Sequence, residues 1–160
     1  MDIPAEDPRA IEVVTAIREG DVAKLQTLLE HDRDLVTARI VDNRRVRRTL
    51  LHIVADWPGH CPNARQTVEL LVQHGADVDA AVNHPSHKEA METPLHWAAS
   101  SDDVALIDAL LDAGANIEAP GAIFTGGAPM SDAVVFAQWN AARRLLERGA
   151  ATTFWQAAAL

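Results

Sequence analysis

The apolar residues of this chain recur in short helical segments, three of which end at a glycine. Residues 104–111 place their apolar side chains on one helical face, and Gly114 follows. The same ending, again with an alanine after the glycine, appears at Gly75 and Gly149. Glycine is a common helix C-cap because it adopts the left-handed conformation without steric cost. The three glycines are 39 and 35 residues apart, a spacing that predicts a structural unit repeated along the chain.

A second and shorter helix is predicted before each of these segments. In the clearest copy Thr93 precedes Pro94, which suits a first helical turn, and Leu95 and Ala98 mark the buried face. Helices of two or three turns do not persist alone in water. Their apolar faces need neighbours, so the pattern predicts an all-α solenoid in which helix pairs stack.

The stretch from Thr93 to Ala119 resembles the ankyrin repeat, with a Thr-Pro-Leu-His helix start, a second helix, a Gly-Ala-Asn turn and a finger-like loop. Looser copies begin near Ile11, Thr49, Ala128 and Thr152. The resemblance implies one ankyrin-repeat domain over residues 1–160, with about four full helix-turn-helix repeats and a truncated fifth. The expected ranges are 8–34, 48–80, 92–119, 127–150 and, for the partial repeat, 151–160. The resemblance also implies protein binding through the finger loops and the concave helix face.

Composition narrows the kind of partner. The net charge of −9 argues against general nucleic-acid binding and against attachment to anionic membranes. Cys61 is the single cysteine, which excludes an internal disulfide and suggests a reducing, cytoplasmic location. Arginine outnumbers lysine by twelve to two, which hints at a GC-rich bacterial genome. A protein partner is therefore expected, and no nucleic acid or membrane.

Three features are candidates for binding that partner. Trp97 should project from its helix towards the concave surface, where tryptophan is a preferred hot-spot residue. Phe124 lies in a finger loop, and Trp57 lies in an insertion between two helices. Arginine forks suit carboxylates and phosphates, and a cluster of them could hold an acidic segment or a phosphorylated ligand. That cluster comprises Arg44, Arg45, Arg47 and Arg48. The plain alternative is a solvated finger whose charges pair with Asp34 and Asp42.

The same insertion supports a second hypothesis, a small-molecule enzyme or sensor. Stacking would bring the insertion beside residues 100–103 and beside Gln138 and Trp139 of the following unit, where a carboxylate next to a histidine could act as an oriented base. The candidates are Asp56, Trp57, His60, Asp102 and Asp103, with Trp57 and Trp139 as pocket walls. The structural alternative is that residues 101–103 cap a helix and Trp139 fills the core. Since no strong catalytic motif is present, the sequence favours a binding module over an enzyme.

Several histidines are candidates for structural hydrogen bonds or for metal binding. His52 and His96 share the Thr-x-x-His position, where we expect hydrogen bonds that tie one repeat to the next. His84 and His87 lie near two glutamates in the finger, but the spacing lacks the helical frame of a zinc site. Those glutamates are Glu89 and Glu92. We expect no metal and no cofactor.

The last residues carry a different expectation. A repeat array normally finishes on a polar helix, whereas this chain finishes on Phe154, Trp155 and Leu160. An exposed apolar end of this kind favours self-association or a partner, or marks a piece of a longer array.

Overall fold

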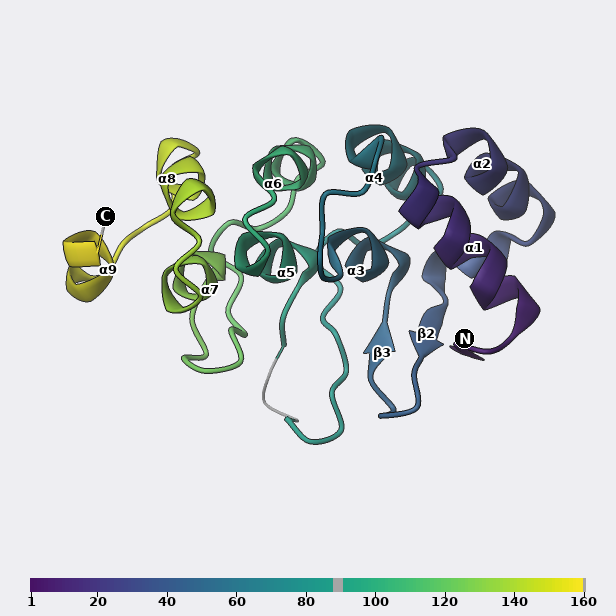
Figure 1. The fold of residues 1–160 in the computed structure, drawn as a ribbon, viewed down its shortest axis with the longest axis horizontal. Helices are drawn as coiled ribbons and strands as arrows, with labels where there is room; N and C mark the ends of the chain where they lie inside the picture. Colours follow the sequence, from purple (N-terminus) through teal and green to yellow (C-terminus); the bar gives the residue numbers. More distant parts are fainter. Residues whose placement is uncertain (88–90, 160) are drawn as a thin grey trace.

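The computed structural model describes residues 1–87 and 91–159, and these residues form a row of helix pairs (Figure 1). The first helices of the pairs are α1 (Pro8–Glu19), α3 (Leu50–Ala55), α5 (Pro94–Ser100) and α7 (Pro129–Val135). Their partners are α2 (Val22–His31), α4 (Ala64–Gln73), α6 (Val104–Asp112) and α8 (Trp139–Glu147). A short 3-10 helix, η1 (Arg33–Thr37), follows α2, and α9 (Phe154–Ala159) ends the described chain.

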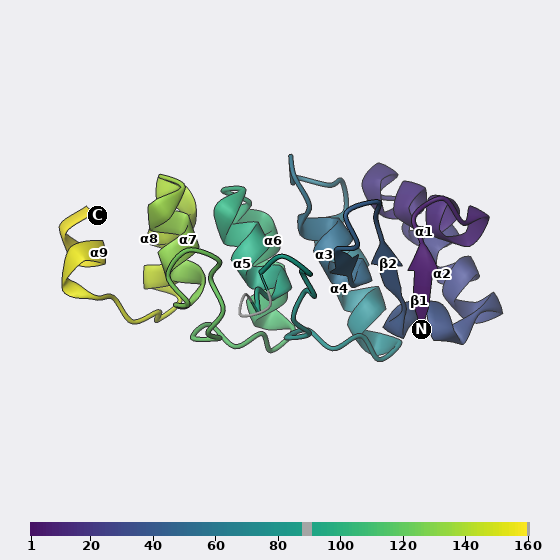
Figure 2. The same cartoon turned by 90° about the horizontal axis from the view of Figure 1, so that it is seen from below.

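The helices are arranged in two layers. In Figure 1, α2, α4, α6 and α8 form one row, α3, α5 and α7 form the other, and the long loops project beyond this second row. Each helix packs against its own partner and against the equivalent helix of the next pair. Figure 2 shows the pairs following one another along a single axis. The buried face between the layers is apolar, with Leu71, Leu95 and Ile107 almost fully inaccessible to solvent, which is the core that stacking was expected to create.

Local sequence signals account for the helix ends. Pro94 stands in the first turn of α5, where its missing N–H costs nothing. Gly20 ends α1 in the left-handed conformation, at φ 66°. Asp103 caps the start of α6, because its carboxylate accepts a hydrogen bond from the Leu106 amide at 3.0 Å. Asp103 is one of the residues 101–103 that the sequence suggested as helix caps.

Asp102 instead caps the second helix of the following pair. Its carboxylate accepts hydrogen bonds from the Ala141 amide and from the Asn140 side chain, both at 2.7 Å. The backbone of Asp102 lies in the left-handed region, at φ 56°. The carboxylate therefore reaches forward to α8, and it joins two pairs of the stack where the sequence suggested a cap within one.

Side chains at one helix position tie successive pairs together, as predicted for the histidines. The Thr93 amide donates to His96 Nδ1 at 3.1 Å, so Nε2 carries the proton and donates to the Gly127 carbonyl at 3.2 Å. His52 Nε2 donates to the Glu92 carbonyl at 3.1 Å in the same way. Burial lowers the pKa of His52 to about 3 and that of His96 to about 4. Both rings are therefore neutral at pH 7, and their role is structural.

The fold is mostly helical rather than all-α, because the N-terminal end carries a small sheet. Strand β1 (Asp2–Pro4) pairs in parallel with β2 (Arg39–Val41), and β2 pairs antiparallel with β3 (Arg47–Arg48). Ile3 lies opposite Ile40 in the first ladder, and both side chains are buried. Strands of two or three residues give no period that a sequence can show, and the parallel pairing joins distant segments. The sheet was therefore outside the reach of the pattern analysis.

Among the described helices, none is long and apolar enough to cross a membrane.

Candidate functional site

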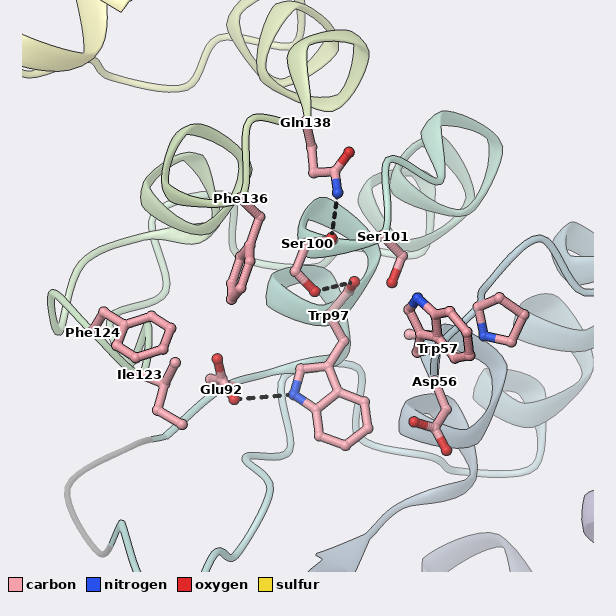
Figure 3. A pocket seen from close by; sticks show the side chains of 12 residues that line it. Asp56, Trp57, Glu92, Trp97, Ser100, Ser101, Ile123, Phe124, Phe136 and Gln138 are labelled. Atoms are coloured by element: carbon pink, nitrogen blue, oxygen red, sulfur yellow. Dashed lines mark hydrogen bonds between the residues drawn. The ribbon is translucent and has the colours of Figure 1, made fainter.

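A groove of about 500 Å³ lies on the side of the stack where the first helices and the long loops meet. Its apolar lining comes from the turn after α3, from α5, from the loop after α6 and from the turn after α7. The aromatic members of the lining are Trp57, Trp97, Phe124 and Phe136. Figure 3 shows Phe124 and Phe136 away from Trp57, with Trp97 between them. The volume falls in the range of ordinary ligand sites, and the lining brings together segments that are far apart in sequence.

Trp97 is the fixed member of this aromatic set. Its indole Nε1–H donates to the Glu92 carboxylate at 3.2 Å. The ring also meets the His52 imidazole edge-on, with centroids 5.0 Å apart. These contacts hold the ring in one orientation while part of it remains accessible. The structure therefore places Trp97 in the groove, where the sequence predicted a concave-surface residue.

The other aromatic rings are far more exposed. Phe124 is 69% exposed and Trp57 is 82% exposed, values that are unusual for large apolar side chains. Phe124 lies beside Phe136, with ring centroids 5.8 Å apart, and Phe136 is 43% exposed. Exposed aromatic residues that gather in one hollow mark an interaction surface more strongly than the same residues scattered.

Phe136 was missed in the sequence, although a signal for it exists. Trp57 follows the N-cap residue Thr49 of its helix by eight positions, and Phe136 follows the N-cap residue Ala128 by the same number. Equivalent positions of successive pairs lie on the same side of a stack. Aligning the units on their helix starts would have grouped these two side chains.

The titration of two acidic side chains is shifted here: Glu92, which lines the groove, and Asp132, which is buried in α7 outside the lining. Burial raises the pKa of Glu92, and the hydrogen bond from Trp97 opposes that rise. Asp132 is only 1% exposed, and neither of its carboxyl oxygens has a hydrogen-bond partner among the described residues. Burial, and then the charge of Glu92, raise the pKa of Asp132 to about 8. Asp132 is therefore mostly protonated at pH 7.

The ankyrin-repeat family model matches residues 47–83 and 92–122. These ranges contain the α3–α4 and α5–α6 pairs and the loops that follow them. The chain contains ankyrin repeats. Ankyrin repeats are in general protein-binding modules. The division of the rest of the chain into further repeats stays a prediction.

The acidic residues of the enzymatic hypothesis are engaged in structural contacts within and between the helix pairs. Asp56 pairs with Arg48 at 2.7 Å and with Arg18 at 3.6 Å. Asp103 accepts a hydrogen bond from the His60 amide at 2.6 Å, in addition to its capping bond. Of the five residues proposed, only Asp56 and Trp57 line the groove. The His60 imidazole lies beside Asp103, with Nδ1 3.7 Å from Oδ1, but neither residue lines the groove. The catalytic role of Asp56, His60, Asp102 and Asp103 stays a prediction.

Trp139 differs from both of its expected roles. It is 38% exposed, so it does not fill the core between the helix pairs. It is also absent from the lining of the groove. As the first residue of α8, it begins a second-layer helix, whereas the groove lies on the side of the first helices and the loops.

The arginine cluster lies along the β2–β3 hairpin, outside the groove lining. Arg48 lies between Asp42 at 3.5 Å and Asp56 at 2.7 Å, and Arg47 pairs with Asp2 at 2.7 Å. Asp42 therefore pairs as expected, whereas no contact between Asp34 and these arginines is present in the described part of the chain. Arg44 and Arg45 are exposed. These two remain available to an acidic partner segment, as proposed from the sequence.

The remaining candidates concern metal, thiol chemistry and the chain end. Within residues 1–87 and 91–159, no three histidine, cysteine or acidic side chains are placed to hold a metal ion; Glu89 lies outside the described residues. Burial raises the pKa of the Cys61 thiol, which disfavours a reactive thiolate.

Phe154 and Trp155 are exposed on α9, and Leu160 lies outside the described residues. Self-association through this end stays a prediction that sedimentation equilibrium would test.

Proposed function

We propose that this protein binds a partner polypeptide in the aromatic groove, with Trp97 and Phe124 as the principal anchors. The observation that carries the proposal is the convergence of four aromatic side chains from separate loops and helices on one hollow. Aromatic side chains bury a large area with few rotatable bonds, which is why they dominate protein interfaces.

The contacts of the aromatic residues also support the assignment of anchors. Trp97 is held by Glu92 and His52, so little conformational freedom is lost when a partner covers it. Phe124 and Trp57 are highly exposed and would gain most from being covered. The exposed Arg44 and Arg45 on the β2–β3 hairpin would meet acidic residues beyond the groove.

The test is a selection of random peptides displayed on phage against the full chain, followed by Kd measurements on synthetic copies of the enriched peptides. We expect Trp97→Ala and Phe124→Ala each to weaken binding by about 30-fold or more, the loss typical of an interface hot spot. Trp139→Ala is the matched control, because Trp139 is a partly exposed tryptophan outside the groove lining. Phe124→Ala guards against a folding artefact, since the Phe124 side chain is largely exposed. Peptides that bind all four proteins equally would refute the proposal.

A further inference from the structure

Glu92 is an acidic residue of the groove lining that forms no ion pair with a described residue. Two other carboxylates of the stack pair with arginine: Asp56, which also lines the groove, with Arg48, and Asp108 with Arg144 and Arg148 at 2.8 and 2.5 Å. The described lysine, arginine and histidine side chains include none that forms an ion pair with Glu92. Its carboxylate accepts a hydrogen bond from the neutral indole of Trp97, and the Ile123 backbone and nearby His84 and His87 also lower its pKa. A half-buried carboxylate thus lines the groove without a compensating cation from the described residues.

The aromatic walls of the groove also favour a positively charged ligand. The faces of aromatic rings are negative, and a cation within about 6 Å of such a face is attracted to it. The Trp97 indole is hydrogen-bonded to the Glu92 carboxylate, and Figure 3 shows this carboxylate beside Ile123 and towards Phe124. A cation next to Glu92 would therefore also lie near aromatic rings.

Asp132 is a second acidic residue near Glu92. It occupies the position in α7 that Trp97 occupies in α5, four residues after the N-cap of the helix. Its carboxyl group is buried without a hydrogen-bond partner among the described residues, a condition that is rare in proteins and often functional. The charge of Glu92 contributes to its raised pKa, so the two carboxyl groups lie close enough to repel each other.

We infer that the groove recognises a basic side chain of the partner polypeptide, an arginine or a lysine, whose cation pairs with Glu92 while its methylene stem packs on Trp97 and Phe124. This inference rests on the proposed function and names the chemistry of its ligand. The argument for this occupant is charge complementarity: a carboxylate that no described arginine or lysine pairs with lies beside aromatic rings, in a protein of net charge −9. Arginine and lysine are the side chains that combine a cation with a long apolar stem.

The experiment compares Glu92→Gln with the unaltered chain, using the synthetic peptides from the display selection. Glutamine keeps the size of the side chain and an acceptor oxygen for the Trp97 indole, and removes only the charge. Each arginine or lysine of a peptide is replaced in turn by norleucine, which keeps the stem and removes the cation. We expect one replacement to weaken binding at least tenfold with the unaltered chain and less than threefold with Glu92→Gln.

A control separates this pairing from the general attraction of an acidic protein for basic peptides. Glu12→Gln removes the same charge from the exposed face of α1, and it should leave the tenfold effect intact. Peptides that need Trp97 and Phe124 but no basic residue would overturn the inference and leave the proposed function standing. The inference would also be overturned if norleucine replacement weakened peptide binding equally in the unaltered chain, Glu12→Gln and Glu92→Gln. Peptides insensitive to Trp97→Ala and Phe124→Ala would overturn both.

Discussion

Replacing Asp132 with asparagine should change how the stability of this protein depends on pH. The Asp132 carboxyl is buried without a hydrogen-bond partner among the described residues, and its pKa is raised to about 8 from an ordinary value of 3.8. Between these two values the folded chain binds a proton more tightly than the unfolded chain does. The free energy of unfolding therefore falls as the pH rises through this window. Asparagine has no proton to lose, so the variant lacks this contribution.

The magnitude follows from the two pKa values. At pH 7 the unfolded carboxyl is almost fully ionised, whereas the folded one must remain protonated or be ionised in a buried place. With about 1.4 kcal/mol for each pKa unit, this costs the native protein about 4 kcal/mol at pH 7 and less than about 1 kcal/mol at pH 4. The buried asparagine amide has an unpaired-group cost of its own, about 1–3 kcal/mol. That cost is independent of pH, so the change with pH is the quantity to measure.

The assay is urea denaturation followed by tryptophan fluorescence for both proteins at several pH values between about 4 and 7. The stability of Asp132→Asn relative to the unaltered chain should rise by about 4 kcal/mol across this range. Buried His52 and His96, whose pKa values are lowered, also change stability with pH, but they do so equally in both proteins and cancel in the difference. The exposed Asp34 provides a control, because Asp34→Asn should leave the pH profile unchanged. Parallel profiles for Asp132→Asn and the unaltered chain would refute the reasoning.

Two further substitutions test the contacts that hold the stack together. Gly20→Ala should destabilise the fold by more than about 2 kcal/mol, because the added Cβ would collide with the Pro62 backbone and the residue has a positive φ. Gly75→Ala, also at a positive φ, meets no neighbouring atom and should cost about 1 kcal/mol. Equal losses of stability for the two variants in thermal denaturation would contradict this reasoning. His96→Ala should cost about 2–4 kcal/mol, because it leaves a buried amide and a carbonyl unpaired. His96→Gln should recover part of that loss, since Gln156 makes the corresponding bonds in the last helix; no recovery in urea denaturation would contradict the interpretation.

The helices could be predicted because their signals are local. The period of apolar residues, the proline in the first turn of α5 and the glycines after the last turns are all contained within a few residues of the helix they define. The histidine ties were predictable for a related reason. A side chain at a repeated position in a stack has equivalent neighbours in each copy, so one sequence position indicates the role of another.

The groove was only partly predictable. Trp97, Phe124 and Trp57 were identified one by one, but their convergence depends on how three loops fold back over the stack. The capping role of Asp102 towards α8 and the burial of Asp132 depend on contacts between neighbouring repeats. Asp132 gave no signal in the sequence, because an acidic residue in the first turns of a short helix normally faces solvent.

The amino-acid sequence by itself therefore determined the ankyrin repeat, the helix pairs and the individual aromatic candidates, since these depend on neighbours within about one repeat. The tertiary structure decided which of those candidates share a surface, which carboxylates are neutralised and which are not. Asp56 directly precedes Trp57 and Glu92 lies five residues before Trp97, yet of these two carboxylates only Asp56 forms an ion pair with an arginine in the folded chain. Charge pairing depends on distances between residues far apart in the chain, and those distances exist only after the repeats have stacked.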